Sequence, residues 1–170
     1  MPGPQNVRFP SHFPLEATVR EKAANDGMTH LSTGVAIVQD GKILGLRRIP
    51  DDYPGGMFEL PGGGIEDGET FMDALKREVS EETGLTVRTF LGMFSGFGYS
   101  TPKKPRIRQF NFLVTVDDSG VKLSPEHDAY EWVDEESLAK LPMTDEMRTK
   151  GFYGAFALLN WQAYAKKHPE

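Results

Sequence analysis

Glu78, Glu81 and Glu82 lie in a segment whose apolar residues recur at helical spacing. At about 100° per residue, Glu78 and Glu82 fall inside the apolar arc of that helix and Glu81 falls on its flank. Carboxylates turned toward a protein interior repel each other and lose hydration, which raises their pKa values. Buried charges persist when they are paired or bound to a metal, and the single neighbouring cation, Arg77, cannot neutralise three acids. The spacing therefore predicts a divalent cation.

The ligand atoms in this prediction are all oxygen, which favours Mg²⁺, with Mn²⁺ as a substitute, over zinc. Such an ion keeps several waters and is commonly shared with substrate phosphates. Two other interpretations fit less well. A solvated charged helix would place its acids on the polar arc, and an EF-hand would space them through a glycine-containing loop.

The elements around these acids indicate an α/β fold. Residues 70–83 predict a helix, because Thr70 and Asp73 form a capping-box pattern and Gly84 suits a left-handed C-cap. Residues 61–64 must bend sharply just before it. The other expected elements are a hairpin of residues 33–39 and 42–48, strands at 57–60, 85–97, 107–116 and 129–133, a short helix after Asp134, and a helical region at 144–167.

This order of elements predicts a mixed β-sheet between helices within one domain, residues 29–170. Residues 1–28, with four prolines and a short helix at 16–25, are expected to form an N-terminal arm. The 170 residues suffice for a core without a metal or disulfide staple.

Composition excludes several classes of function. The absence of cysteine excludes disulfides, thiolate metal sites and cysteine nucleophiles. The four histidines show neither zinc-ligand spacing nor a serine triad. A net charge of −6 suits a small anion bridged by metal better than a long nucleic acid. No apolar run is long enough for a membrane span and no signal peptide is evident, so a cytoplasmic location is expected.

Together, these residues resemble the Nudix hydrolase family, in its MutT-like form. The resemblance is carried by Gly63, Glu69 and the run REVSEETGL at 77–85, which agree with the Nudix box at every defined position. The preceding residues 60–64, LPGGG, also look like the family's lead-in. The resemblance implies an α/β/α Nudix sandwich and Mg-dependent hydrolysis of a diphosphate bond in a nucleotide-type substrate. Since members are often dimers, a homodimer is a further expectation.

The resemblance also implies roles for particular residues. Glu78, Glu81 and Glu82 would bind the metal together with the Gly62 carbonyl. Glu69 and Arg77 would support them by pairing loop to helix. Glu126, five residues before Glu131-Trp132, matches the position of a further acid in MutT-type members. Either Glu126 or Glu78 would be the general base.

Three residues are candidates for substrate binding. Arg48 looks like the family's phosphate-contacting basic residue, although a simple surface arginine is nearly as good an interpretation. Gly63 borders the expected site. Asp145 lies near the position where MutT-type enzymes recognise a purine edge, but the interpretation that it belongs to a helix cap beside Thr144 is slightly preferred.

Three functions remain open. The leading hypothesis is a nucleoside triphosphate pyrophosphohydrolase, with oxidised purine nucleotides as candidate substrates. The second is an ADP-ribose or nucleotide-sugar pyrophosphatase. The third, a Nudix-fold nucleotide sensor without catalysis, is disfavoured by the complete box. The sequence does not choose among the substrates.

Overall fold

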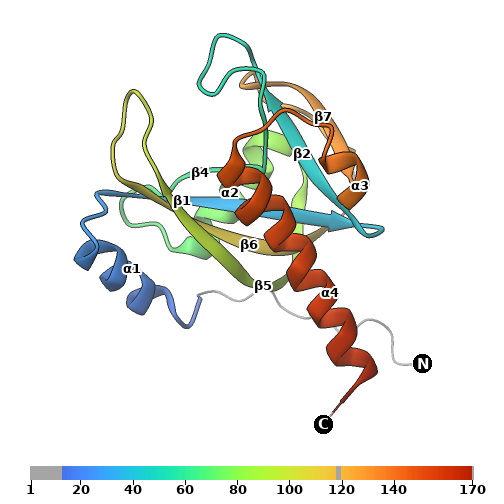
Figure 1. Ribbon diagram of the computed structural model, residues 1–170. Coiled ribbons are helices and arrows are strands. Elements are labelled where there is room, and N and C mark those ends of the chain that lie inside the picture. The colour runs from blue at the N-terminus through green and yellow to red at the C-terminus, as the bar shows by residue number, and fades with distance from the viewer. Residues whose placement is uncertain (1–12, 118–119, 170) are drawn as a thin grey trace.

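A computed structural model describes residues 13–117 and 120–169, and it forms a mixed β-sheet between helices (Figure 1). Part of the expected N-terminal arm, residues 1–12, lies outside the described residues. The elements follow in the order α1 (Glu16–Asn25), β1 (His30–Gln39), β2 (Lys42–Arg48), β3 (Phe58–Glu59), β4 (Gly62–Gly64), α2 (Phe71–Thr83), β5 (Thr86–Tyr99), β6 (Ile107–Asp117), β7 (His127–Val133), α3 (Glu135–Leu138), a π-helical turn (Met147–Phe152) and α4 (Tyr153–Lys167).

The sheet is built around β1. The strand order is β3-β2-β1-β6-β5, with β4 paired to β1 and β7 paired to β2. Only the β1–β6 pair is parallel among the pairings of the described strands; the others are antiparallel. The β1–β2 hairpin agrees with the sequence prediction, and both turn residues, Asp40 and Gly41, have the positive φ that a type I′ turn requires.

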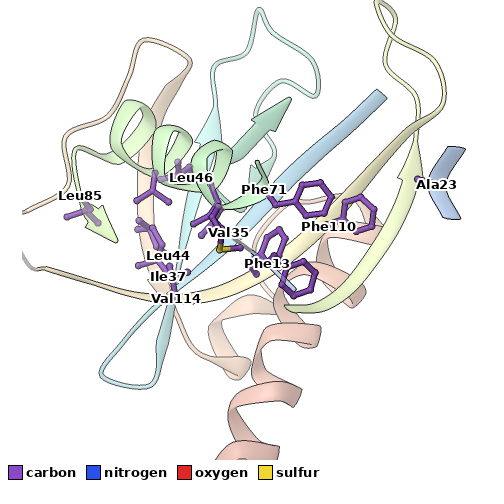
Figure 2. Close-up of a cluster of buried hydrophobic side chains, with 14 residues drawn as sticks. Phe13, Ala23, Val35, Ile37, Leu44, Leu46, Phe71, Leu85, Phe110 and Val114 are labelled. Carbon is purple, nitrogen blue, oxygen red and sulfur yellow. The ribbon is translucent and has the colours of Figure 1, made fainter. Parts of the chain in front are cut away.

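Both faces of the sheet are covered, as the near-continuous apolar strands require. Val35 and Ile37 of β1 pack under α2, whereas Ala36 between them packs toward the π-helical turn and α4. Figure 1 shows α2 and α4 on opposite faces of the sheet, and Figure 2 shows the aromatic end of the α2 core. The predicted α/β/α arrangement is confirmed.

The N-terminal helix α1 packs beside the start of α2. Phe13, just before α1, lies in the α2 core with its ring centroid 6.4 Å from that of Phe71 (Figure 2). Glu16 accepts a hydrogen bond from the Phe71 amide. Arg20 donates to the Glu69 carbonyl and lies over the Phe71 ring. This helix therefore contacts the loop that carries Glu69.

The glycine-rich segment differs from its sequence prediction. Residues 61–64 were expected only to bend, but Gly62–Gly64 forms a short strand, β4, in which Gly63 pairs with Thr33 of β1. The reason is close approach: a Cβ on Gly62 would lie 2.0 Å from the Thr33 carbonyl oxygen, and Gly62 has a φ of +153°. Only glycine fits there. The segment thus reaches the α2 carboxylates.

No helix in the described ranges 13–117 and 120–169 is both long and apolar enough to cross a membrane.

Candidate active site

The acidic helix α2 begins and ends as its sequence predicts. Thr70 and Asp73 form a capping box, and Gly84 ends the helix in the left-handed conformation. These signals fix the register of the helix, and the apolar residues of α2 pack into the core beneath it. Glu78 and Glu82, which share that face, are consequently only 8% and 3% exposed. The predicted burial of both carboxylates is confirmed.

Arg77 connects the Glu69 loop to this helix. Its Nε and Nη2 donate to the two carboxylate oxygens of Glu69 at 2.7 and 2.8 Å. Its Nη1 donates to Glu78 Oε1 at 2.8 Å, and Nη2 also reaches the Gly64 carbonyl. The expected pairing of Glu69 with Arg77 is therefore present. Glu81 is different, because its side chain is 59% exposed and meets Arg77 only at 3.3 Å.

The β4 glycines bring the backbone against the carboxylates. The Gly62 amide donates to Glu82 Oε2 at 2.9 Å. A Cβ on Gly63 would lie 2.5 Å from Glu78 Oε1, so a side chain there would displace the carboxylate. Gly62 and Gly63 are thus next to the two buried acids.

Burial controls the protonation of these acids. Loss of hydration raises the pKa of Glu82 to about 9, against the Gly62 hydrogen bond and with help from the charges of Glu78, Glu59 and Glu126. Loss of hydration also raises the pKa of Glu78, although Arg77 opposes the shift. The Arg77 hydrogen bonds hold the pKa of Glu69 below its usual range. Arg77 therefore satisfies Glu69 and leaves Glu82 without a cation among the described contacts.

Glu126 lies beside this pair, as its sequence position suggested, and it brings His127 with it. One carboxylate oxygen each of Glu82 and Glu126 and one ring nitrogen of His127 lie within 4.8 Å of one another. Glu82 and His127 are buried and Glu126 is exposed. A site of this kind offers oxygen and nitrogen donors and excess negative charge, so its residues fit a divalent cation.

Glu59 is a site residue that the sequence reasoning missed. It accepts hydrogen bonds from Arg48 Nε and His127 Nε2 at 3.0 and 2.9 Å. The available signal was a charged residue between the apolar Phe58 and Leu60, just before the glycine segment. Strand alternation places such a residue on the opposite face from its neighbours.

Arg48 lines two neighbouring pockets, which we call the two lobes of a cleft. One lobe, of about 480 Å³, is lined by Arg20, Arg48, Gly63, Glu66, Asp67 and Lys104, among others. We call it the polar lobe. The second, of about 390 Å³, is lined by residues including Arg48, Tyr53, Glu59, Phe97, Gln109 and Met147. We call it the aromatic lobe. Arg48, Tyr99 and Thr101 line both lobes.

Two of the three substrate-binding candidates therefore border this cleft. Arg48 is largely buried, with ion pairs to Glu59 and Asp52, so it is not a simple surface arginine. Gly63 lines the polar lobe. Asp145 is exposed and lines neither lobe, whereas its neighbour Thr144 accepts a hydrogen bond from the Met147 amide in the manner of a helix cap.

Comparisons with known proteins agree with this geometry. Residues 28–153 match the NUDIX domain family. An ADP-ribose pyrophosphatase from Methanocaldococcus jannaschii is 36% identical over 120 residues, which cover 68% of each chain. An RNA pyrophosphohydrolase from Gluconobacter oxydans is 34% identical over 125 residues, covering 63% of this chain and 72% of the relative. The crystal structure of a MutT protein from Methanosarcina mazei superimposes with a TM-score of 0.63 at 27% identity, covering 77% of this chain and 94% of the other.

This chain belongs to the NUDIX domain family. It is a Nudix hydrolase, an enzyme class in which a divalent metal assists the hydrolysis of nucleotide-type substrates.

Replacing Gly63 with alanine should disturb catalysis more than folding. The new methyl group would displace the Glu78 carboxylate, and we expect kcat/KM to fall by about 10- to 100-fold, since small misplacements of catalytic groups cost that much. The melting temperature should change little, because the atoms that the new methyl group meets are the flexible end of the Glu78 side chain, which can move aside. Gly64→Ala is the matched control, since its Cβ meets no atom within 4 Å. Equal activity of both variants in steady-state kinetics would contradict this placement of Glu78.

The metal-free protein should lose stability as the pH rises from about 4.5 to 9. In that window the unfolded chain has already released the Glu82 proton, whereas the folded protein still holds it. The free energy of unfolding should therefore fall by on the order of 1 kcal/mol per pH unit at most. Glu82→Gln, which can still accept from the Gly62 amide, should flatten this dependence.

The measurement is urea unfolding in EDTA between pH 5 and 9, repeated with saturating Mg²⁺. The wild-type protein should gain more stability from Mg²⁺ at high pH, and the variant should gain little at any pH. A wild-type stability that rises through this window would show that Glu82 is ionised without a metal.

Proposed function

We propose that this enzyme hydrolyses the diphosphate bond of a nucleoside diphosphate linked to a sugar, as in ADP-ribose or a nucleotide sugar, with Mg²⁺ as its cofactor. The observation that supports the substrate class is the two-lobed cleft, whose lobes share Arg48 beside the acidic cluster. A diphosphate flanked by two different groups would place one group in each lobe.

The aromatic lobe suits a nucleobase. Tyr53 and Phe97 offer ring surfaces, and Gln109 also lines this lobe, with its Nε2 donating to Asn111 Oδ1 at 2.8 Å. Gly34 makes room for this carboxamide pair, because a Cβ there would lie 2.3 Å from an atom of each side chain. Carboxamides donate and accept hydrogen bonds as base edges do.

The polar lobe suits a sugar better than additional phosphate. Its lining combines the cations Arg20 and Lys104 with the acids Glu66 and Asp67. Neutral hydroxyl groups can bond to both kinds of side chain, whereas a charged phosphate tail would be repelled by the acids. This mixture favours the second of the three functions that the sequence left open, and so does the similarity to an ADP-ribose pyrophosphatase.

Five residues around α2 and β4 would hold the metal ion. Glu78 and Glu82, with Glu81, Glu126 and the Gly62 carbonyl, would hold the divalent cation, which neutralises the diphosphate and stabilises charge on the attacking and leaving oxygens when bound.

Arg48 would orient the diphosphate. Glu126 would take a proton from the attacking water, and we favour it over Glu78 because it is exposed, whereas Glu78 already accepts from Arg77. One water is consumed, and a nucleoside monophosphate and a sugar phosphate leave. The expected setting is the cytoplasm, with the protein as a monomer or homodimer.

A substrate panel tests this proposal. ADP-ribose, a nucleotide sugar, dGTP, 8-oxo-dGTP and a 5′-triphosphate RNA would be incubated with the protein and Mg²⁺, and the products separated by anion-exchange chromatography. We expect kcat/KM to be at least about tenfold higher for the sugar-linked substrates, which is a difference of roughly 1.4 kcal/mol.

The alternative outcomes are distinct. Pyrophosphate release from a triphosphate as the fastest reaction would establish the nucleoside triphosphate hypothesis instead. Preference for the RNA would show that the polar lobe admits a polynucleotide end. Tight binding without turnover across the panel would identify a sensor.

Lys104→Ala tests the polar lobe separately. The variant lacks the ammonium group that would donate a hydrogen bond to a sugar hydroxyl. KM for the sugar-linked substrate should therefore rise by about fivefold, which corresponds to the free energy of roughly one hydrogen bond, and kcat should stay nearly unchanged. The adjacent Lys103→Ala is the control, because Lys103 lines neither lobe. If the two variants show the same KM, the sugar does not occupy the polar lobe.

A further inference from the structure

The imidazole of His127 has an unusual environment. Its side chain has no exposed surface, and its Nε2 lies 2.9 Å from Glu59 Oε1. The other ring nitrogen, Nδ1, is buried and has no hydrogen-bond partner among the described residues. Burying a polar atom without a hydrogen-bond partner destabilises the folded protein, so a partner that binds Nδ1 in the working enzyme would explain this arrangement.

The contacts of Glu59 fix which nitrogen is available. Glu59 Oε1 accepts a hydrogen bond from Arg48 Nε at 3.0 Å and forms an ion pair with Arg48 Nη2 at 2.9 Å. A carboxylate accepts hydrogen bonds, and the His127 nitrogen facing it is therefore the one that carries a hydrogen. A neutral ring in this tautomer keeps a lone pair on Nδ1.

That ring lies beside the metal-binding carboxylates. One of its nitrogens is within 4.8 Å of oxygens of both Glu82 and Glu126. Histidines that bind metals commonly donate their other ring N–H to a carboxylate, which fixes the ring. Glu59 and His127 have this arrangement.

We propose that His127 supplies a nitrogen ligand to the divalent cation of this enzyme, next to Glu82 and Glu126. The inference rests on the metal-dependent function proposed above and goes beyond it, because the family resemblance implied oxygen ligands alone. His127 follows Glu126 directly at the start of β7, so one short segment delivers both ligands.

A nitrogen ligand changes which ions the site prefers. Imidazole suits ions such as Zn²⁺, Fe²⁺ and Ni²⁺, whereas Mg²⁺ prefers oxygen, and affinity for a nitrogen-containing site rises in the order Mn²⁺, Fe²⁺, Co²⁺, Ni²⁺. The enzyme should therefore bind Co²⁺, and to a smaller degree Mn²⁺, more tightly than a site with oxygen donors only. The competing explanation is that His127 is a structural tie between β7 and β3 and never touches the ion.

Pulsed electron paramagnetic resonance of the full chain loaded with Mn²⁺ separates these explanations. A coordinated imidazole produces modulation from a ¹⁴N nucleus, which should change to a ¹⁵N pattern when the protein is made with ¹⁵N-histidine. This comparison needs no substitution, so it does not depend on the folding of a variant.

Two variants assign the signal to a residue. His127→Gln can still donate to Glu59 but lacks the Nδ1 atom, so it should lose the nitrogen modulation while retaining Mn²⁺. Its Mn²⁺ affinity should fall by about tenfold or more, the usual effect of disturbing a metal ligand or its support, and Mg²⁺ affinity should change by less than about threefold. His168→Gln, on the exposed end of α4, is the control and should behave as the wild type.

One outcome would overturn this inference and leave the proposed function intact: Mn²⁺ binds, its binding is lost in a Glu82 variant, and the spectrum shows no modulation from a histidine nitrogen. Absence of Mn²⁺ and Mg²⁺ binding altogether would instead overturn the metal site on which both proposals rest.

Discussion

The site depends on two carboxylates, Glu78 and Glu82, that the fold removes from water. Their burial follows from the register of α2, because the helix can bury its apolar face only by burying these acids with it. One arginine, Arg77, is available on the same helix, and it is committed to Glu69 and Glu78. Among the described contacts, the Glu82 carboxylate accepts a hydrogen bond from the Gly62 amide and meets no cation, so its surroundings fit a bound divalent cation.

The rest of the sandwich brings other segments to that position. β1 carries β4 along its edge, so the glycines approach α2 closely enough to contact Glu82 and leave space for Glu78. β2 pairs with β7 and thereby places Arg48 opposite His127. The cleft reaches these segments through Arg48, Glu59 and Gly63, which line its lobes. The arrangement places the proposed metal site and the proposed substrate cleft on neighbouring strands of the sheet.

Much of this could be predicted from sequence, for local reasons. The hairpin turn at Asp40-Gly41 and the caps of α2 are determined by neighbouring residues, and the inward direction of Glu78 and Glu82 follows from helical periodicity alone. The β1–β2 hairpin follows from the same local signals, whereas the Glu69–Arg77 pair was implied by the resemblance to the Nudix family.

What could not be predicted depends on pairing between distant strands. Glu59 and His127 are 68 positions apart, and nothing local to either indicates that β2 lies between their strands. The β4 strand was read as a bend because three glycines carry no strand pattern, and its partner in β1 became visible only in the fold. Asp145 is exposed and lines neither lobe, although its neighbours Thr144 and Glu146 line the aromatic lobe, so its role in substrate binding stays a prediction.

The most direct test of the central claim is anomalous diffraction from crystals of the protein grown with Mn²⁺. The account predicts an anomalous peak within coordination distance of the Glu82 carboxylate, in the space between α2, β4 and the start of β7. A fully occupied peak bound only to exposed acids, with Glu82 still hydrogen-bonded to Gly62 and free of metal, would contradict it.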